Sequence, residues 1–126
     1  MLSLRLVAVS SLFIVTIGCG SNYSSPANPS PAPTPGGPSA SVAIPIGAAT
    51  LGNRAYTPDD LNVAVGTTVT WMNSDSQAHT STSDVNGWNS GSVAPGGQFS
   101  VAFQTPGTFA YHCTIHPGMV GTVVVR

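Results

Sequence analysis

The segment from Cys113 to Met119 carries a thiol, an imidazole and a thioether at even spacing, on Cys113, His116 and Met119. A thiolate, an imidazole and a weak thioether donor together suit copper better than the other common metals of proteins. One more imidazole would complete a trigonal set of two nitrogens and one sulfur with a long axial thioether. His79, in the Ser/Thr-rich stretch upstream, is the candidate for that position. The sequence therefore indicates a mononuclear copper site.

The elements that must position these ligands are predicted to be strands. Leu61, Val63 and Val65 alternate with polar or small residues, which predicts that these three side chains point inward. No amphipathic helix is evident, and short β-rich runs are separated by Gly, Pro, Asn and Asp, which predicts an all-β sandwich of about seven or eight strands. Cys113, His116 and Met119 would share one tight loop between the last two predicted strands. Six of the predicted strands cover residues 41–46, 61–65, 67–73, 98–103, 107–111 and 121–125.

Charged side chains are sparse, with three Lys+Arg and four Asp+Glu making up 6% of the chain. Ordinary domains carry about 25%. No basic stripe exists that could bind nucleic acid, and long-range electrostatic steering of a partner would be weak. Composition therefore excludes nucleic-acid binding and leaves apolar contacts to guide any docking.

Residues 1–18 are typical of a lipoprotein signal peptide. Arg5 precedes an apolar run that is too short to span a bilayer comfortably. Gly18-Cys19 resembles the lipobox of bacterial lipoproteins, in which the Cys is lipidated and becomes the mature N-terminus, although Thr16 stands where Leu is usual. The alternative is an ordinary signal peptide cut nearby, which would leave Cys19 free. We expect an exported protein, periplasmic or at the cell surface, held to the membrane by a lipid on Cys19.

Residues 19–40 combine that Cys with a Pro/Ser-rich linker, in which prolines recur every two or three positions. Such a segment is semi-extended, and about twenty residues would reach on the order of 40–60 Å. We interpret it as a tether, the alternative being a segment without a role. The folded domain is expected over residues 41–126. With Cys19 lipidated and Cys113 on a metal, no disulfide can form, so the metal would stabilise this small domain.

From about Tyr56 to Val125 the chain resembles the small cupredoxins, the plastocyanin–azurin family of blue copper proteins. The short Cys-x-x-His-x-x-Met loop is of the amicyanin type. The resemblance implies a cupredoxin-like Greek-key β-sandwich that holds one type 1 copper ion. It is carried by Tyr56-Thr57-Pro58, by Val69 to Asn73 followed by His79, by Pro95-Gly96 before a Phe-rich strand, and by Tyr111-His112-Cys113 to Met119.

The resemblance also assigns roles to the candidate ligands. Cys113 would be the thiolate ligand, His79 and His116 the imidazole ligands, and Met119 the weak axial ligand. The ring edge of His116 would emerge through an apolar patch where redox partner proteins dock. Each residue has a plainer alternative: a buried apolar side chain for Cys113, solvated loop histidines, and core packing for Met119.

Three neighbours of the ligands carry further expectations. Thr80 stands where many family members have Asn or Ser, and we expect its N–H to reach the Cys113 sulfur and its hydroxyl to hold the ligand loop. His112 should point away from Cys113 because side chains alternate along a strand, so it is not expected to be a ligand. Ile115 replaces the usual Pro, and its N–H is a second expected donor to the sulfur.

Three functions remain open at this point. The first is a monomeric one-electron carrier whose copper cycles between Cu(II) and Cu(I). The second, alternative function is a lipoprotein that holds or delivers copper without transferring electrons. The third is a structural zinc site, which Met119 argues against because zinc takes Cys, His, Asp or Glu. Four protein ligands would close the site, whereas catalytic metals keep an open position, so an enzyme is not expected.

Overall fold

The computed structural model of the protein describes residues 36–126. The predicted signal peptide, Cys19 and most of the predicted linker lie outside the described residues. Within this range no helix has the length and apolar character needed to cross a membrane. The elements are β1 (Ser39–Ile44), the short 3-10 helices η1 (Ala48–Thr50) and η2 (Gly52–Arg54), β2 (Asp60–Val63), β3 (Thr67–Asn73), β4 (Thr82–Ser83), β5 (Gln98–Phe103), β6 (Gly107–His112) and β7 (Val120–Val125).

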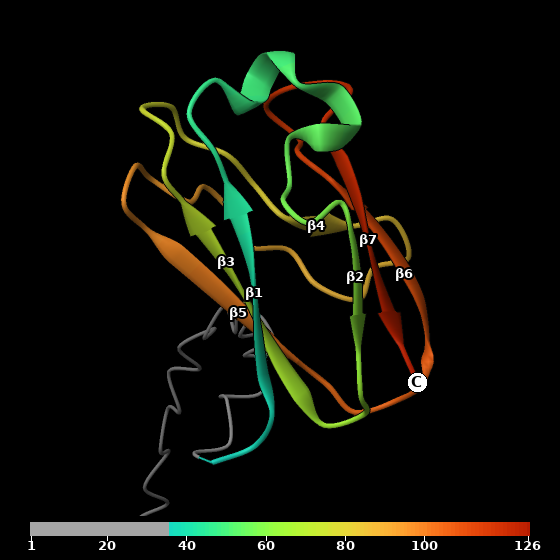
Figure 1. Cartoon of the computed structure of the whole chain (residues 1–126). Helices are drawn as coiled ribbons and strands as arrows, with labels where there is room; N and C mark the ends of the chain where they lie inside the picture. Colours follow the sequence, from blue (N-terminus) through green and yellow to red (C-terminus); the bar gives the residue numbers. More distant parts are fainter. Residues whose placement is uncertain (1–35) are drawn as a thin grey trace, which may run out of the picture.

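The strands form two sheets that face each other, which confirms the predicted β-sandwich (Figure 1). One sheet has the order β1-β3-β5, with β1 parallel and β5 antiparallel to β3. The other has the order β2-β7-β6-β4, with β2 parallel to β7 and the remaining neighbours antiparallel. Sequence neighbours therefore often lie in different sheets, so the chain crosses repeatedly from one layer to the other.

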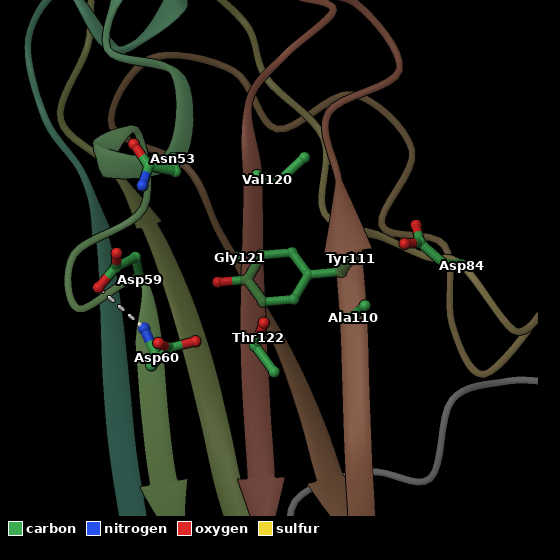
Figure 2. A pocket seen from close by; sticks show the side chains of 9 residues that line it. All are labelled: Asn53, Asp59, Asp60, Asp84, Ala110, Tyr111, Val120, Gly121 and Thr122. Atoms are coloured by element: carbon green, nitrogen blue, oxygen red, sulfur yellow. Dashed lines mark hydrogen bonds between the residues drawn. The ribbon is translucent and has the colours of Figure 1, made fainter.

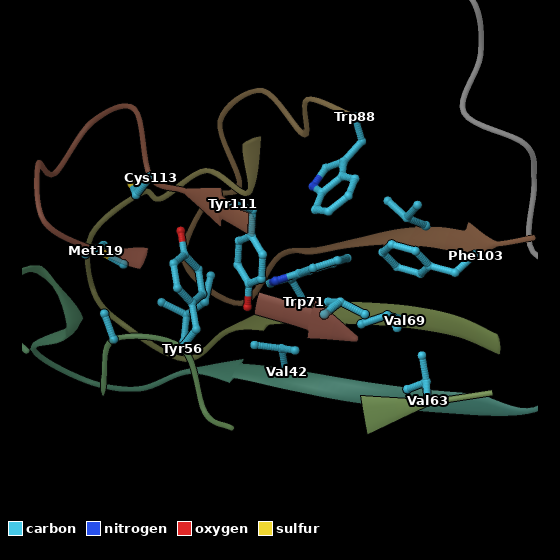
Figure 3. Packing of buried hydrophobic residues seen from close by; sticks show 14 of the residues in the cluster. Val42, Tyr56, Val63, Val69, Trp71, Trp88, Phe103, Tyr111, Cys113 and Met119 are labelled. Carbon is cyan, nitrogen blue, oxygen red and sulfur yellow. The ribbon is translucent and has the colours of Figure 1, made fainter. Parts of the chain in front are cut away.

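Aromatic side chains fill much of the space between the sheets (Figure 3). Trp71 of β3 is fully buried, and its ring centroid lies 5.3 Å from that of Tyr111 and 5.6 Å from that of Trp88. Tyr56 packs edge-on against Tyr111 at 4.8 Å. Such large buried rings supply much of the apolar area that stabilises a small sandwich. Cys113 and Met119 lie at one end of this core.

The strand pattern was predicted well where apolar residues alternate cleanly, and it was wrong at Val65. β3 and β5 begin and end at the predicted residues, 67–73 and 98–103. Val65 is 44% exposed because β2 ends at Val63. Thr67 N–H donates to the carbonyl of Ala64, which closes a turn and lifts Val65 out of the sheet.

One end of the sandwich collects the segments that carry the candidate ligands. β3 ends there, β6 leaves the sheet there and β7 enters it there (Figure 1). The two 3-10 helices cap the same end. The predicted residues at this end are thus supplied by two loops, one after β3 and one between β6 and β7.

Candidate metal centre

The loop from Cys113 to Met119 is closed by its own backbone. The N–H of Cys113 donates to the carbonyl of Met119 at 3.1 Å, and the N–H of Met119 donates to the carbonyl of His116 at 3.3 Å. Gly118 has a φ of 94°, a conformation that favours glycine, so the tight turn depends on it. These contacts bring the backbones of Cys113, His116 and Met119 close together.

His79 arrives from the other loop and is held by its backbone. Its N–H donates to the carbonyl of Val93 at 3.1 Å, and the N–H of Val93 donates back at 2.8 Å. This isolated bridge fixes the main chain on both sides of the ring. The His79 ring is fully buried and packs against the ring of His116, with centroids 4.7 Å apart.

Three of the four predicted ligands converge. The Nδ1 atoms of His79 and His116 lie 3.1 Å apart, and the Cys113 Sγ lies 4.0 Å from the first and 3.8 Å from the second. No other group of three His, Cys, Asp or Glu in residues 36–126 brings its ligand atoms together in this way. Cys113 is 3% exposed and Met119 is fully buried, whereas His116 is partly exposed.

The Nε2 atom of each ring has a hydrogen-bond acceptor, and this determines whether the Nδ1 atom carries a proton or a lone pair. His79 Nε2 lies 2.9 Å from Asp75 Oδ2, and His116 Nε2 lies 3.2 Å from Gln77 Oε1. A proton on each Nε2 leaves a lone pair on each Nδ1. Two lone pairs and a sulfur then converge on one small volume, which is the arrangement that a copper ion satisfies once the thiol has lost its proton.

Asp75 was not identified from the sequence, yet it is the buried acid of the site. Its carboxylate is 2% exposed. Oδ1 accepts the N–H of Gly47 at 3.1 Å and that of Ser76 at 2.7 Å, while Oδ2 faces His79. The hydrogen bond with His79, followed by those from the backbone N–H groups, lowers the pKa of Asp75 to about 2. The only hint in the sequence is an acid four residues before a candidate ligand.

Thr80 behaves as predicted. Its backbone N–H donates to the Cys113 Sγ at 3.3 Å, and its Oγ1 accepts the N–H of Thr114 at 2.8 Å. The expectation for Ile115 was wrong: among the described residues, Thr80 is the only one whose backbone N–H donates to this sulfur. The Ile115 side chain is 46% exposed beside His116 in the sequence.

Tyr56 is a second neighbour that the sequence did not reveal as part of the site. Its hydroxyl donates to the carbonyl of Thr80, directly behind the residue that contacts the sulfur. The pKa of Tyr56 is raised well above its ordinary value, first by burial and then by the negative charge of a nearby Cys113 thiolate. Tyr56 therefore stays neutral and keeps its hydrogen bond.

His112 lies outside the ligand group, as predicted. Its Nδ1 pairs with Asp84 Oδ1 at 2.5 Å, and both side chains are partly exposed, at 41% and 48%. Asp84 also lines a surface pocket of about 330 Å³ together with Asp59 and Asp60 (Figure 2). Figure 2 shows the two neighbouring acids on one side of Tyr111 and Asp84 on the other, so the three carboxylates do not converge.

A β-sandwich that brings two histidines and a buried cysteine together at one end defines a small copper protein of the cupredoxin class. Residues 47–126 match the family described as copper binding proteins, plastocyanin/azurin family. The chain belongs to this family, and its cofactor is one copper ion. The resemblance seen in the sequence is thereby confirmed.

Individual relatives show how far the similarity extends. Amicyanin of Paracoccus denitrificans is 35% identical over 82 residues, which cover 60% of this chain and 62% of amicyanin. The solved structure of a purple cupredoxin from Nitrosopumilus maritimus is 39% identical, with a TM-score of 0.63, over 69% of this chain and 99% of that one. A copper-containing nitrite reductase from Thermus scotoductus matches over 22% of its length, with 25% identity and a TM-score of 0.57.

Proposed function

We propose that this protein transfers single electrons through a type 1 copper ion that cycles between Cu(II) and Cu(I). The proposed ligands are His79, Cys113, His116 and Met119. The observation that carries the proposal is the convergence of two Nδ1 atoms and one Sγ. Hydrogen bonds at the Nε2 atoms hold the two rings in place. Membership of a copper-binding family supports a role in copper-based electron transfer in general.

The surroundings of the site support a carrier rather than an enzyme. Copper supplies the redox couple when bound, and the chain holds its ligands in one arrangement. His79 and Met119 are fully buried and Cys113 is almost so, whereas a catalytic metal needs a position that is open to a substrate. Because both ligand loops are tied together through Thr80, little should rearrange when the charge of the metal changes.

His116 is the proposed exit for the electron. It is the one member of the converging group that is partly exposed. Ile115, Pro117 and Gly118 beside it in the loop are exposed and carry no charge. We define these three residues with His116 as the docking patch, and propose that redox partner proteins bind to it through apolar contacts.

A visible absorption spectrum of the copper-loaded protein tests the function. The proposal predicts the intense blue band of a copper–thiolate site and a reversible one-electron wave in voltammetry. Cys113→Ser should abolish the band, and a Cys113→Ser protein that stays blue would falsify the assignment. The alternative function, copper delivery, is favoured instead if the wild-type protein gives up its copper rapidly to a chelator.

The cellular location of the protein is a separate part of the proposal. We place the domain outside the cytoplasm, as a periplasmic or cell-surface lipoprotein anchored through Cys19. The support is the apolar run that ends at Cys19 and the Pro-rich segment that follows it. Cys19→Ala should move the protein from the membrane fraction to the soluble fraction, and an unchanged distribution would contradict the anchor.

A further inference from the structure

We propose that Asp75 is a positioning residue that sets the tautomer of His79 and holds the reduction potential of the copper site down. This inference rests on the proposed function, because it concerns the same metal centre. It adds a charged residue that is not a ligand but acts through one. Three features of the carboxylate support this role: its burial, its hydrogen bonds and its charge.

The carboxylate has a separate partner set for each oxygen. Oδ1 accepts two backbone N–H groups, from Gly47 and Ser76, and Oδ2 faces His79 Nε2 at 2.9 Å. A carboxylate accepts at both oxygens and donates at neither when ionised. His79 must therefore carry its proton on Nε2, which presents the Nδ1 lone pair to the metal.

The two histidines are held differently. His116 Nε2 meets the neutral amide oxygen of Gln77, an exposed residue, at 3.2 Å. His79 Nε2 meets a full negative charge that is almost completely buried. A hydrogen bond to an ion is stronger than one to a neutral acceptor, and it makes the imidazole a better donor to the metal. Of the two imidazole rings, His79 is therefore the one whose donor strength is raised by a charged neighbour.

The charge of Asp75 bears on the redox equilibrium directly. With a thiolate and a carboxylate in place, a Cu(II) site is neutral and a Cu(I) site carries one net negative charge. Net charge in a buried site is unfavourable, so Asp75 stabilises Cu(II) relative to Cu(I). Removing the charge while keeping the shape should therefore raise the reduction potential.

The shape of the segment does not depend on the carboxylate alone. Asn73 holds the same turn: its Oδ1 accepts the N–H of Asp75 at 2.9 Å, and its Nδ2 donates to the carbonyls of Gln77 and Val93 at 2.8 and 2.9 Å. The main chain around His79 is fixed by its bridge to Val93 as well. A change confined to the Asp75 side chain thus leaves the frame of the loop in place.

Asp75→Asn is the decisive variant, since one amide cannot reproduce both oxygens. If the amide oxygen keeps the two N–H groups, its NH₂ group turns to His79 and drives the ring proton onto Nδ1. We expect Cu(II) affinity to fall by about 10–100-fold. We also expect a rise in potential equivalent to at least a tenfold change in the Cu(II)/Cu(I) ratio, about 59 mV. Asp60→Asn, which removes the same charge from an exposed side chain, should change neither quantity.

Nitrogen-15 NMR of metal-free wild-type protein supplies a measurement that needs no variant. His79 should carry its proton on Nε2, and this proton should exchange slowly with solvent. A proton on Nδ1 would overturn the inference even if Asp75→Asn does not fold. Equal potentials in the Asp75→Asn and Asp60→Asn proteins would overturn it too. A wild-type protein that is neither blue nor redox-active would instead refute the proposed function. The NMR measurement of the His79 tautomer would still test the role of Asp75 in that case.

Discussion

The hydroxyl oxygen of Thr80 accepts the N–H of Thr114 at 2.8 Å, while the N–H of Thr80 itself donates to the Cys113 sulfur at 3.3 Å. One residue of the upstream loop thus holds two consecutive residues of the ligand loop. The side chain fixes the backbone that follows the cysteine, and the main chain contacts the sulfur. These two contributions can be separated by mutation, because a side-chain change leaves the N–H in place.

Thr80→Val should lower the free energy of unfolding by about 1 kcal/mol, since the Thr114 N–H loses its acceptor. The absorption of the copper-loaded protein should hardly change, because the backbone donor to Cys113 remains. Denaturant titration and a visible spectrum measure the two effects. Thr82→Val is the matched control, as Thr82 contacts the Thr80 hydroxyl but not the ligand loop. Equal losses in both variants would show that the link to Thr114 contributes nothing.

Met119→Gln should keep copper bound and lower the reduction potential, because an amide oxygen is a stronger axial donor than a thioether and favours Cu(II). The expected shift is of the order of a tenfold change in the redox equilibrium, about 59 mV. Voltammetry measures it. Met72→Gln serves as the control, since Met72 is 48% exposed on β3. An unchanged potential in Met119→Gln would mean that another group occupies the axial position.

The buried hydroxyl of Tyr56 should make the free energy of unfolding depend on pH in the alkaline range. Its pKa is raised by burial, so the folded state keeps the proton that the unfolded chain releases above its ordinary pKa of 10.0. The unfolded state then binds fewer protons, and stability should fall as pH rises beyond about 10. Metal-free Tyr56→Phe should be less stable at neutral pH by about 1 kcal/mol but lose less on going to high pH. Parallel profiles for the two proteins would contradict the shift.

Electron transfer at the docking patch should depend weakly on ionic strength, because Ile115, Pro117 and Gly118 carry no charge. Stopped-flow rates with a redox partner, measured from low to high salt, should be nearly flat. Asp60→Asn should leave the rates unchanged. A steep decrease with salt in the wild-type protein, relieved in Asp60→Asn, would instead place the partner at the pocket lined by Asp59, Asp60 and Asp84.

The parts of the fold that the sequence predicted are those governed by local alternation. Val69 and Trp71 share one face of residues 67–73, Phe99, Val101 and Phe103 share one face of residues 98–103, and β3 and β5 have these bounds. β4 was missed because Thr82 and Ser83 are two polar residues whose strand conformation comes from pairing with Tyr111 and His112 and from the bridge between Thr82 and Asn89. A strand that depends on its partner leaves no periodic pattern of its own.

The candidate site shows the same division. Cys113, His116 and His79 could be found from residue type and spacing, whereas the role of Thr80 was implied by the resemblance to the cupredoxins. Asp75 could not be found, because an acid in a Ser-rich loop is ordinarily solvated. Its burial depends on the N–H of Gly47, which is brought to it by a segment 28 residues away. The direction of the Ile115 N–H depends on the closed shape of the loop, which spacing does not give.

The strand that opens the described part of the chain begins at the opposite end of the sandwich from the ligand loop (Figure 1). β1 starts at Ser39 and runs toward the end where Cys113 and His116 lie. If the residues before Ser39 tether the domain, as proposed, the tether joins it at the end remote from the candidate copper ligands. A membrane surface to which the chain is fixed would then lie at the opposite end of the domain from His116. His116 would face away from that surface, where partner proteins can reach it.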